Sequence, residues 1–195
     1  MIKLKLSFKG SRNYLQGGDI FNSLTSNLLE IFPDSFITNL LFRRFAKNQL
    51  CVLFDKIEDE SKIIGHGNLK IKNKSIKKFW IKEIDDEVTS SYEFNEDLIL
   101  NYTIINKNQI SIINRDIFSL IENIIILTKK INYLICPLTN DRWIFSQIKL
   151  EKIFPNSWNK IDIILDKMIK KSYSECKIII DNKNHGVIRF MTAKI

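Results

Sequence analysis

The sequence has few of the residues on which catalytic and metal sites are usually built. Only two histidines and three cysteines occur among its 195 residues. The cysteines, Cys51, Cys136 and Cys176, are odd in number and widely spaced, which fits neither a disulfide framework nor a set of zinc ligands. Six glycines and three prolines exclude collagen-like and low-complexity classes. No phosphate-binding glycine loop, nucleophile-elbow serine or His-Glu-x-x-His motif is present. We therefore expect reduced thiols, a cytoplasmic location, and neither a metal nor a cofactor.

Long hydrophobic runs are also missing. The most apolar stretch, residues 117–135, is broken by Glu122, Lys129 and Lys130, so it does not predict a membrane span. The first residues alternate between apolar and polar types, which differs from the continuous apolar core of a secretory signal. With 45% hydrophobic and 27% charged residues, the composition is that of an ordinary globular protein.

The charge is unbalanced toward lysine and arginine, at +8 with a pI of about 9.3. A positive surface favours an anionic partner. Nucleic acid, the phosphates of coenzyme A and an acidic carrier protein all qualify. The abundance of Ile, Lys and Asn would also follow from AT-rich codons, so the charge by itself selects no partner.

Hydrophobic periodicity organises the first half of the chain. Residues 2–8 alternate as a half-buried strand does. After a loop, Asp19 stands where a helix N-cap is expected, and apolar residues then recur every three or four positions as far as Pro33. Further strands are expected at residues 36–54, 63–71 and 75–84.

The second half repeats this order. Asp116 is expected to cap a helix that runs to about Cys136, followed by strands and a closing hairpin with its turn at residues 182–186. The tripeptide Asp-Ile-Phe opens both expected helices, about half a chain length apart. The repeated order of elements predicts an internal duplication, with one unit at residues 1–88 and another at 89–195.

A long helix wrapped by a curved antiparallel sheet, present twice, resembles the hotdog superfamily in its double-hotdog form. The closest local likenesses are residues 12–19, which lead into the first helix, and the hairpin of residues 175–190. The fold class implied is α+β, with two long central helices wrapped by a curved antiparallel sheet. The resemblance implies action on acyl thioesters of acyl carrier protein or coenzyme A, as a dehydratase or thioesterase in lipid or polyketide metabolism. It also implies a homodimer, or assembly with another hotdog protein.

The same resemblance directs attention to the start of the first helix. Amides at a helix N-terminus stabilise a developing oxyanion, and a nearby carboxylate can act as a general base. The candidate catalytic residues are Asp19, Tyr14 and His66; the candidate oxyanion and substrate-binding residues are Gly17, Gly18 and Arg12. The alternative is purely structural, with Asp19 as the helix cap and the glycines as turn residues.

Other interpretations stay open. Hotdog dehydratases pair a histidine with a helix carboxylate, whereas His185 is expected in an exposed turn and His66 on a strand after the first helix. The chain could thus be an inactive hotdog partner subunit. A third interpretation is a nucleic-acid-binding protein that uses the basic and aromatic residues 70–80. For that segment a solvated hairpin with Phe79 and Trp80 packed inward is the more common arrangement, so nucleic acid is the least favoured partner.

Overall fold

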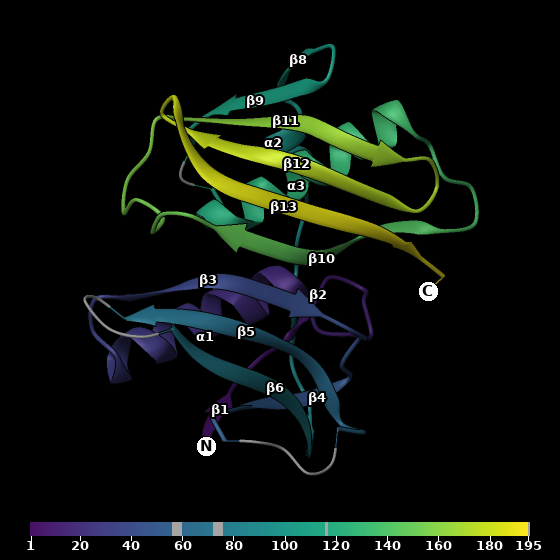
Figure 1. Cartoon of the computed structure of the whole chain (residues 1–195). Coiled ribbons are helices and arrows are strands. Elements are labelled where there is room, and N and C mark those ends of the chain that lie inside the picture. The colour runs from purple at the N-terminus through teal and green to yellow at the C-terminus, as the bar shows by residue number, and fades with distance from the viewer. Residues whose placement is uncertain (56–59, 72–75, 116, 195) are drawn as a thin grey trace. The chain divides into compact units, whose positions relative to one another are not determined.

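The computed structural model describes residues 1–55, 60–71, 76–115 and 117–194. The chain divides into two compact units, Met1–Asn95 and Glu96–Ile195. In each unit one long helix packs against a face of an antiparallel sheet (Figure 1). Within the described ranges, no helix combines the length and the apolar character needed to cross a lipid bilayer.

The first unit contains a five-stranded antiparallel sheet in the order β1-β4-β6-β5-β3. A short parallel pair, β2 with β7, lies apart from that sheet. The elements are β1 (Ile2–Leu4), β2 (Phe8–Lys9), α1 (Gly17–Ile31), β3 (Ser35–Phe42), β4 (Asn48–Leu53), β5 (Ile63–Ile71), β6 (Ile76–Glu87) and β7 (Ser91–Tyr92).

Helix α1 begins three residues earlier than the sequence predicts. Its N-cap is Gln16, which makes no side-chain capping bond, and Asp19 lies in the first turn. The expected role of Asp19 as N-cap is therefore wrong. The helix ends at Ile31, just before Pro33, because a proline has no amide hydrogen to continue the ladder. Its buried side chains, spaced by three and four residues, are Ile20, Phe21, Leu24 and Leu28.

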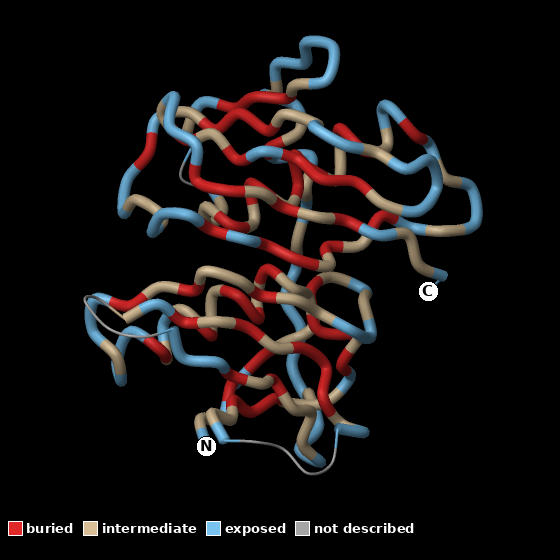
Figure 2. The backbone as a smooth tube through the Cα atoms, in the orientation of Figure 1, coloured by how far each residue is buried: buried red, intermediate tan, exposed pale blue. Residues whose placement is uncertain are grey.

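Alternation along the strands separates two faces of this sheet. One face carries fully buried side chains such as Leu40 and Phe79 and packs under α1. Figure 2 shows buried positions alternating with less buried ones along the strands. Gly67 lies between these two residues in the register of β3, β5 and β6. A Cβ at residue 67 would lie 2.4 Å from the Phe79 ring and 2.5 Å from the Asn39 carbonyl oxygen. Because Gly67 has no side chain, the Phe79 ring can pack directly over the backbone of β5 at this position.

The second unit contains a six-stranded antiparallel sheet in the order β10-β13-β12-β11-β9-β8. Its elements are α2 (Asp97–Leu100), β8 (Ile104–Asn106), β9 (Gln109–Ile113), α3 (Leu120–Ile135), β10 (Arg142–Leu150), β11 (Lys160–Ile169), β12 (Tyr173–Ile180) and β13 (Lys183–Ala193). Helix α3 packs against β9, β10, β11 and β12.

The start of α3 also differs from the sequence prediction. Its N-cap is Ser119, and the Ser119 and Glu122 side chains form a reciprocal capping box with each other's backbone amides. Ile117 and Phe118 precede the helix, and Asp116 lies outside the described residues. The shared tripeptide therefore does not open both helices. The acidic residues at the third helical position, Asp19 and Glu122, correspond instead.

The closing hairpin is present, but its turn is tighter than expected. Asp181 and Asn182 connect β12 to β13 with positive φ angles of 48° and 63°, as a two-residue hairpin turn requires. His185 lies in β13, where the register shifts, and it is 7% exposed. The prediction of an exposed turn histidine is wrong, because the turn ends before residue 183.

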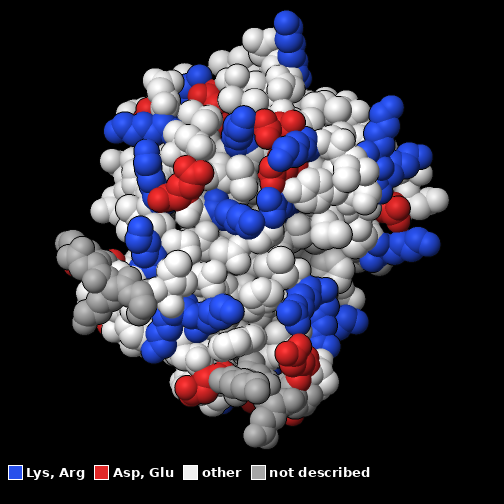
Figure 3. Space-filling model, in the orientation of Figure 1, with Lys and Arg blue, Asp and Glu red and all other residues white. Residues whose placement is uncertain are grey.

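Four polar side chains form a cross-strand row on the outer face of the second sheet. The register aligns Gln147, Arg189, Glu175 and Lys167 on β10, β13, β12 and β11. The Arg189 Nε donates to Glu175 Oε2 at 2.5 Å, and the Tyr173 hydroxyl donates to the same oxygen at 3.1 Å. Acidic and basic side chains stand together on this face (Figure 3). Burial works to raise the pKa of Glu175, but the bonds from Arg189 and Tyr173 and the nearby charges together lower it.

We expect Gly67→Ala to destabilise the protein by about 1–3 kcal/mol, because the added methyl group meets the Phe79 ring in a closed core. In a Phe79→Leu background the same substitution should cost less, since the smaller side chain leaves room. Urea unfolding of the four variants measures both costs. The neighbouring change Asn68→Ala, on the half-buried outer face, should shift stability by no more than about 0.5 kcal/mol. An equal cost for Gly67→Ala in both backgrounds would contradict the packing argument.

We expect Glu175→Gln to lower stability by about 1–3 kcal/mol at pH 7 and to flatten its acid dependence. The pKa of Glu175 is lower in the folded chain than its ordinary value of 4.5. The unfolded chain therefore binds the proton first as the pH falls. The contribution of Glu175 to the free energy of unfolding is fully present at pH values well above 4.5. It is lost as the pH drops through the lowered pKa of the folded chain. Unfolding free energies from pH 7 to about pH 3 test this, with the exposed Glu151→Gln as the control.

Candidate functional site

The candidate site lies at the N-terminus of α1 in the first unit. Gly17, Gly18 and Asp19 occupy the first three helical positions. The first amide with an acceptor one turn back is that of Ile20, which donates to the Gln16 carbonyl oxygen at 3.0 Å. The three preceding amides have no such acceptor within the helix, and the helix dipole favours negative charge beside them. This end of α1 therefore suits an anion or a polarised carbonyl oxygen.

A buried ion pair stands at this helix end. The Lys9 Nζ lies 3.0 Å from Asp19 Oδ1, and the two side chains are only 6% and 11% exposed. Removing two charges from water is costly unless they compensate each other. The pair therefore joins the end of β2 firmly to the first turn of α1.

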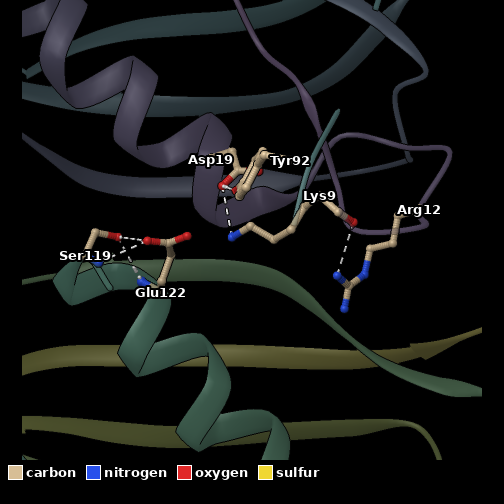
Figure 4. Close-up of polar contacts among 6 residues, drawn as sticks. All are labelled: Lys9, Arg12, Asp19, Tyr92, Ser119 and Glu122. Carbon is tan, nitrogen blue, oxygen red and sulfur yellow. Dashed lines mark hydrogen bonds and ion pairs between the residues drawn. The ribbon is translucent and has the colours of Figure 1, made fainter. Parts of the chain in front are cut away.

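Two aromatic residues from the end of the first unit complete the group. The Tyr92 hydroxyl donates to Asp19 Oδ1 at 2.9 Å. The Lys9 Nζ lies 4.0 Å from the centroid of the Phe94 ring and 5.6 Å from that of Tyr92, both within cation–π range. The parallel pairing of Lys9 with Tyr92 brings them together, and Figure 4 shows Lys9 and Tyr92 converging on Asp19.

The second carboxylate oxygen of Asp19 is left over. Lys9 and Tyr92 both contact Oδ1, whereas Oδ2 is buried and accepts no hydrogen bond within the described residues. Buried polar atoms are nearly always paired in folded proteins. An oriented carboxylate with one unused oxygen can accept a proton or hydrogen bond from a bound molecule.

The structure brings together some of the residues expected from the sequence and separates others. Asp19, Gly17 and Gly18 share the first turn of α1. Arg12 is close in the chain, and its Nη1 donates to the Lys9 carbonyl oxygen at 3.4 Å. Tyr14 is 8% exposed, and its ring packs against Phe45 with 4.6 Å between centroids.

His66 lies elsewhere in the first unit. It pairs with Leu41 and Trp80 on the half-exposed outer face of the sheet, whereas its neighbours Gly65 and Gly67 face the buried side. Within the described residues, neither Tyr14 nor His66 forms a hydrogen bond with Asp19. The alternation of side chains along β5 points His66 away from α1.

Sequence reasoning missed Lys9, Tyr92 and Phe94. The only signal for Lys9 was a lysine that follows Phe8 at the end of an alternating strand. Tyr92 and Phe94 lie more than 70 residues from Asp19 along the chain and belong to no recognisable motif. Only the pairing of β2 with β7 reveals them.

The other potentially reactive side chains, Glu122 and Cys176, have structural roles or are buried. Glu122 belongs to the Ser119 capping box, which Figure 4 shows at the start of α3. Burial raises the pKa of the Cys176 thiol to about 12, which leaves it unreactive. Over the described ranges, no group of three or more His, Cys, Asp or Glu side chains could hold a metal ion.

We expect Asp19→Asn to destabilise the protein by about 3–5 kcal/mol, because it leaves the buried Lys9 ammonium without a counter-charge. Replacing both partners, as Lys9→Met with Asp19→Asn, should recover most of this loss, since no unpaired charge then remains buried. Chemical unfolding of the single and double variants measures the coupling. Additive effects of the two substitutions would show that the ion pair contributes nothing.

Comparison with known proteins shows a likeness at the level of the fold. No family model matches the sequence, and no curated protein matches it either. Among solved structures, the dehydratase domain of PpsC from Mycobacterium tuberculosis, in complex with C12:1-CoA, superposes with a TM-score of 0.50. The two are 6% identical, and the alignment covers 93% of this chain and 85% of that one.

A putative thioesterase II from Thermobifida fusca YX also matches, with a TM-score of 0.48 and 8% identity. The alignment covers 94% of this chain and 87% of the thioesterase. At 6% identity the likeness to the PpsC domain is one of fold alone. What the PpsC comparison establishes is the architecture: the chain has the hotdog fold.

Proposed function

We propose that the protein hydrolyses acyl thioesters carried by coenzyme A or by an acyl carrier protein. The observation that supports this most directly is the oriented Asp19 carboxylate beside the first amides of α1. A hotdog domain with this architecture, that of PpsC, was solved with an acyl-CoA bound. Shared fold does not by itself fix activity, so the proposal depends on the site.

In the proposed reaction a water molecule attacks the thioester carbonyl carbon. The Asp19 Oδ2 accepts a proton from that water as the new carbon–oxygen bond forms. The carbonyl oxygen becomes an oxyanion, to which the amides of Gly17 and Gly18 can donate while the helix dipole stabilises the charge. The carbon–sulfur bond then breaks, and the proton passes from Asp19 to the leaving thiolate. The products are a free carboxylic acid and a thiol.

The partners of Asp19 have supporting roles in this scheme. Tyr92 holds Oδ1 in place, which leaves Oδ2 to receive the proton. Lys9 adds a fixed positive charge at the helix end, where negative charge develops. Arg12, in the loop before α1, would bind the anionic phosphates of the carrier; its Nη1 bond to the Lys9 carbonyl oxygen keeps it close to Lys9.

Hydrolysis fits the site better than dehydration. A hotdog dehydratase is expected to use a histidine together with its carboxylate. Here His66 faces the outer side of the first sheet and His185 is buried in β13 of the second unit. A carboxylate that activates water needs no histidine. A catalytically inactive partner subunit remains the alternative that the activity test distinguishes.

We expect the protein to release thiol from a panel of acyl-CoA and acyl-carrier-protein thioesters. The variant with Lys9→Met and Asp19→Asn should lose at least about 100-fold in kcat/KM, because it lacks the general base. This double variant is the informative one, since its buried charges are removed together and its melting temperature establishes whether it is folded. Thiol release followed with a chromogenic disulfide reagent measures the rates.

Glu30→Gln provides the matched control, because Glu30 is an exposed carboxyl group at the opposite end of the same helix. Its kcat/KM should stay within about twofold of the original. Binding of acyl thioesters without turnover would favour the inactive partner subunit. Turnover that survives in the folded double variant would exclude Asp19 as the base.

A further inference from the structure

The first unit has a hollow on the face of its sheet that points away from α1. Its volume is about 240 Å³. The side chains that line it come from β3, the residues just after it, β5 and β6. They are Asn39, Arg43, His66, Asn68, Lys78 and Trp80. Gly67 and Phe79, which alternate with these residues along β5 and β6, also line the hollow.

The register explains why these residues share one face. His66 pairs with Trp80, and Asn68 pairs with both Asn39 and Lys78. The residues between them, Gly67 and Phe79, are buried and belong to the face of the sheet that packs against α1. In an antiparallel sheet, directly paired residues project from the same face. The sequence prediction that Trp80 packs inward is therefore wrong, although it holds for Phe79.

The aromatic component of the hollow is distinctive. Trp80 is only partly buried, whereas Trp143 and Trp158 are 2% and 9% exposed and belong to the core of the second unit. Trp80 therefore places a large apolar ring on a solvated face, next to basic residues. Such a ring offers a platform on which a planar base can stack.

Positive charge surrounds this platform. Lys78 is exposed, and within the described part of the chain Arg43 forms an exposed ion pair with Glu60, at 3.2 Å. Exposed pairs of this kind contribute little stability, so a phosphate can compete for the arginine. Figure 3 shows Lys and Arg side chains standing around uncharged surface on this face of the first unit.

The polar atoms of the hollow can also donate and accept hydrogen bonds. Asn39 and Asn68 line the hollow, and the side-chain amide of an asparagine matches the donor and acceptor edges of a nucleobase. The His66 Nδ1 is buried and has no hydrogen-bond partner within the described residues. Burial, together with the charges of Arg43 and Lys78, lowers the pKa of His66. The imidazole is therefore mainly neutral at pH 7, with one nitrogen able to accept.

We propose that this hollow binds one nucleotide, with its base stacked on Trp80 and its phosphate held by Arg43 and Lys78. The two asparagines and His66 contact the edge of the base. The nucleotide can be a free mononucleotide or one residue of an unpaired RNA strand. This site lies on the opposite face of the sheet from Asp19 and does not depend on the proposed hydrolysis.

Quenching of Trp80 fluorescence tests the proposal with two probes, adenosine monophosphate and an eight-residue oligouridylate. We expect saturable quenching that weakens several-fold when salt rises from about 50 to about 200 mM. Tighter binding of the oligouridylate assigns the site to a strand, and equal binding assigns it to a free nucleotide. The absence of quenching by both probes overturns the proposal.

Substitutions distinguish binding in the hollow from non-specific attraction to the basic surface. Changing Arg43 and Lys78 together to Gln should weaken oligouridylate binding at least about tenfold, measured by anisotropy of a labelled probe. Trp80→Leu should weaken it by a similar factor, because a stacked base is lost. The matched control, Arg44→Gln, removes a neighbouring exposed arginine outside the hollow and should change affinity less than about twofold.

Two results would contradict the nucleotide assignment. Octaglutamate that binds as tightly as oligouridylate would show a site for acidic peptides, without any role for the base. Equal weakening by Arg44→Gln and by the double Arg43 and Lys78 variant would show only diffuse electrostatic attraction. Melting temperatures of all variants establish that each is folded during the measurement.

Discussion

A lysine ammonium that is almost completely buried is the constraint from which the organisation of the first unit follows. Lys9 needs a counter-charge, and Asp19 supplies it at 3.0 Å. The two residues belong to β2 and α1, and Tyr92 of β7 bonds to the same carboxylate. One charge pair thus connects the beginning, the central helix and the end of the unit. It also orients Asp19 at the end of α1 whose first amides have no acceptor within the helix.

The outer faces of the two sheets differ in how their polar side chains are hydrogen-bonded. In the second unit, Glu175 and Arg189 bond across strands, and Gln147 accepts from the arginine at 2.7 Å. The polar groups of that row satisfy one another and stabilise the sheet. In the first unit, the outer face holds Trp80 and the buried Nδ1 of His66, which has no hydrogen-bond partner among the residues that the structure describes. A buried nitrogen of this kind is suited to a hydrogen bond from a ligand.

The hotdog fold is shared with a domain that is only 6% identical in sequence. This is understandable because the fold requires a helix with one broad apolar face and strands that alternate, and many sequences meet those conditions. The helix of the first unit shows this, since Ile20, Leu24 and Leu28 recur at the required spacing. The chemistry depends on a few polar residues, which the fold does not specify. Asp19 and Lys9 therefore say more about activity than the architecture does.

The sequence by itself determined the class of fold, because apolar residues recur every 3.6 residues in helices and every 2 in strands. These patterns are local and depend only on neighbouring residues. It also singled out Asp19, Gly17 and Gly18, since glycines before an apolar helix are a local signal. It misplaced both helix starts, because Asp19 and Asp116 resemble capping residues while Gln16 and Ser119 hold those positions. Only the tertiary structure decided that Lys9 and Tyr92 meet at Asp19 and that Trp80 faces outward. Those outcomes depend on strand pairing and register between distant segments, and no local pattern encodes which strands pair.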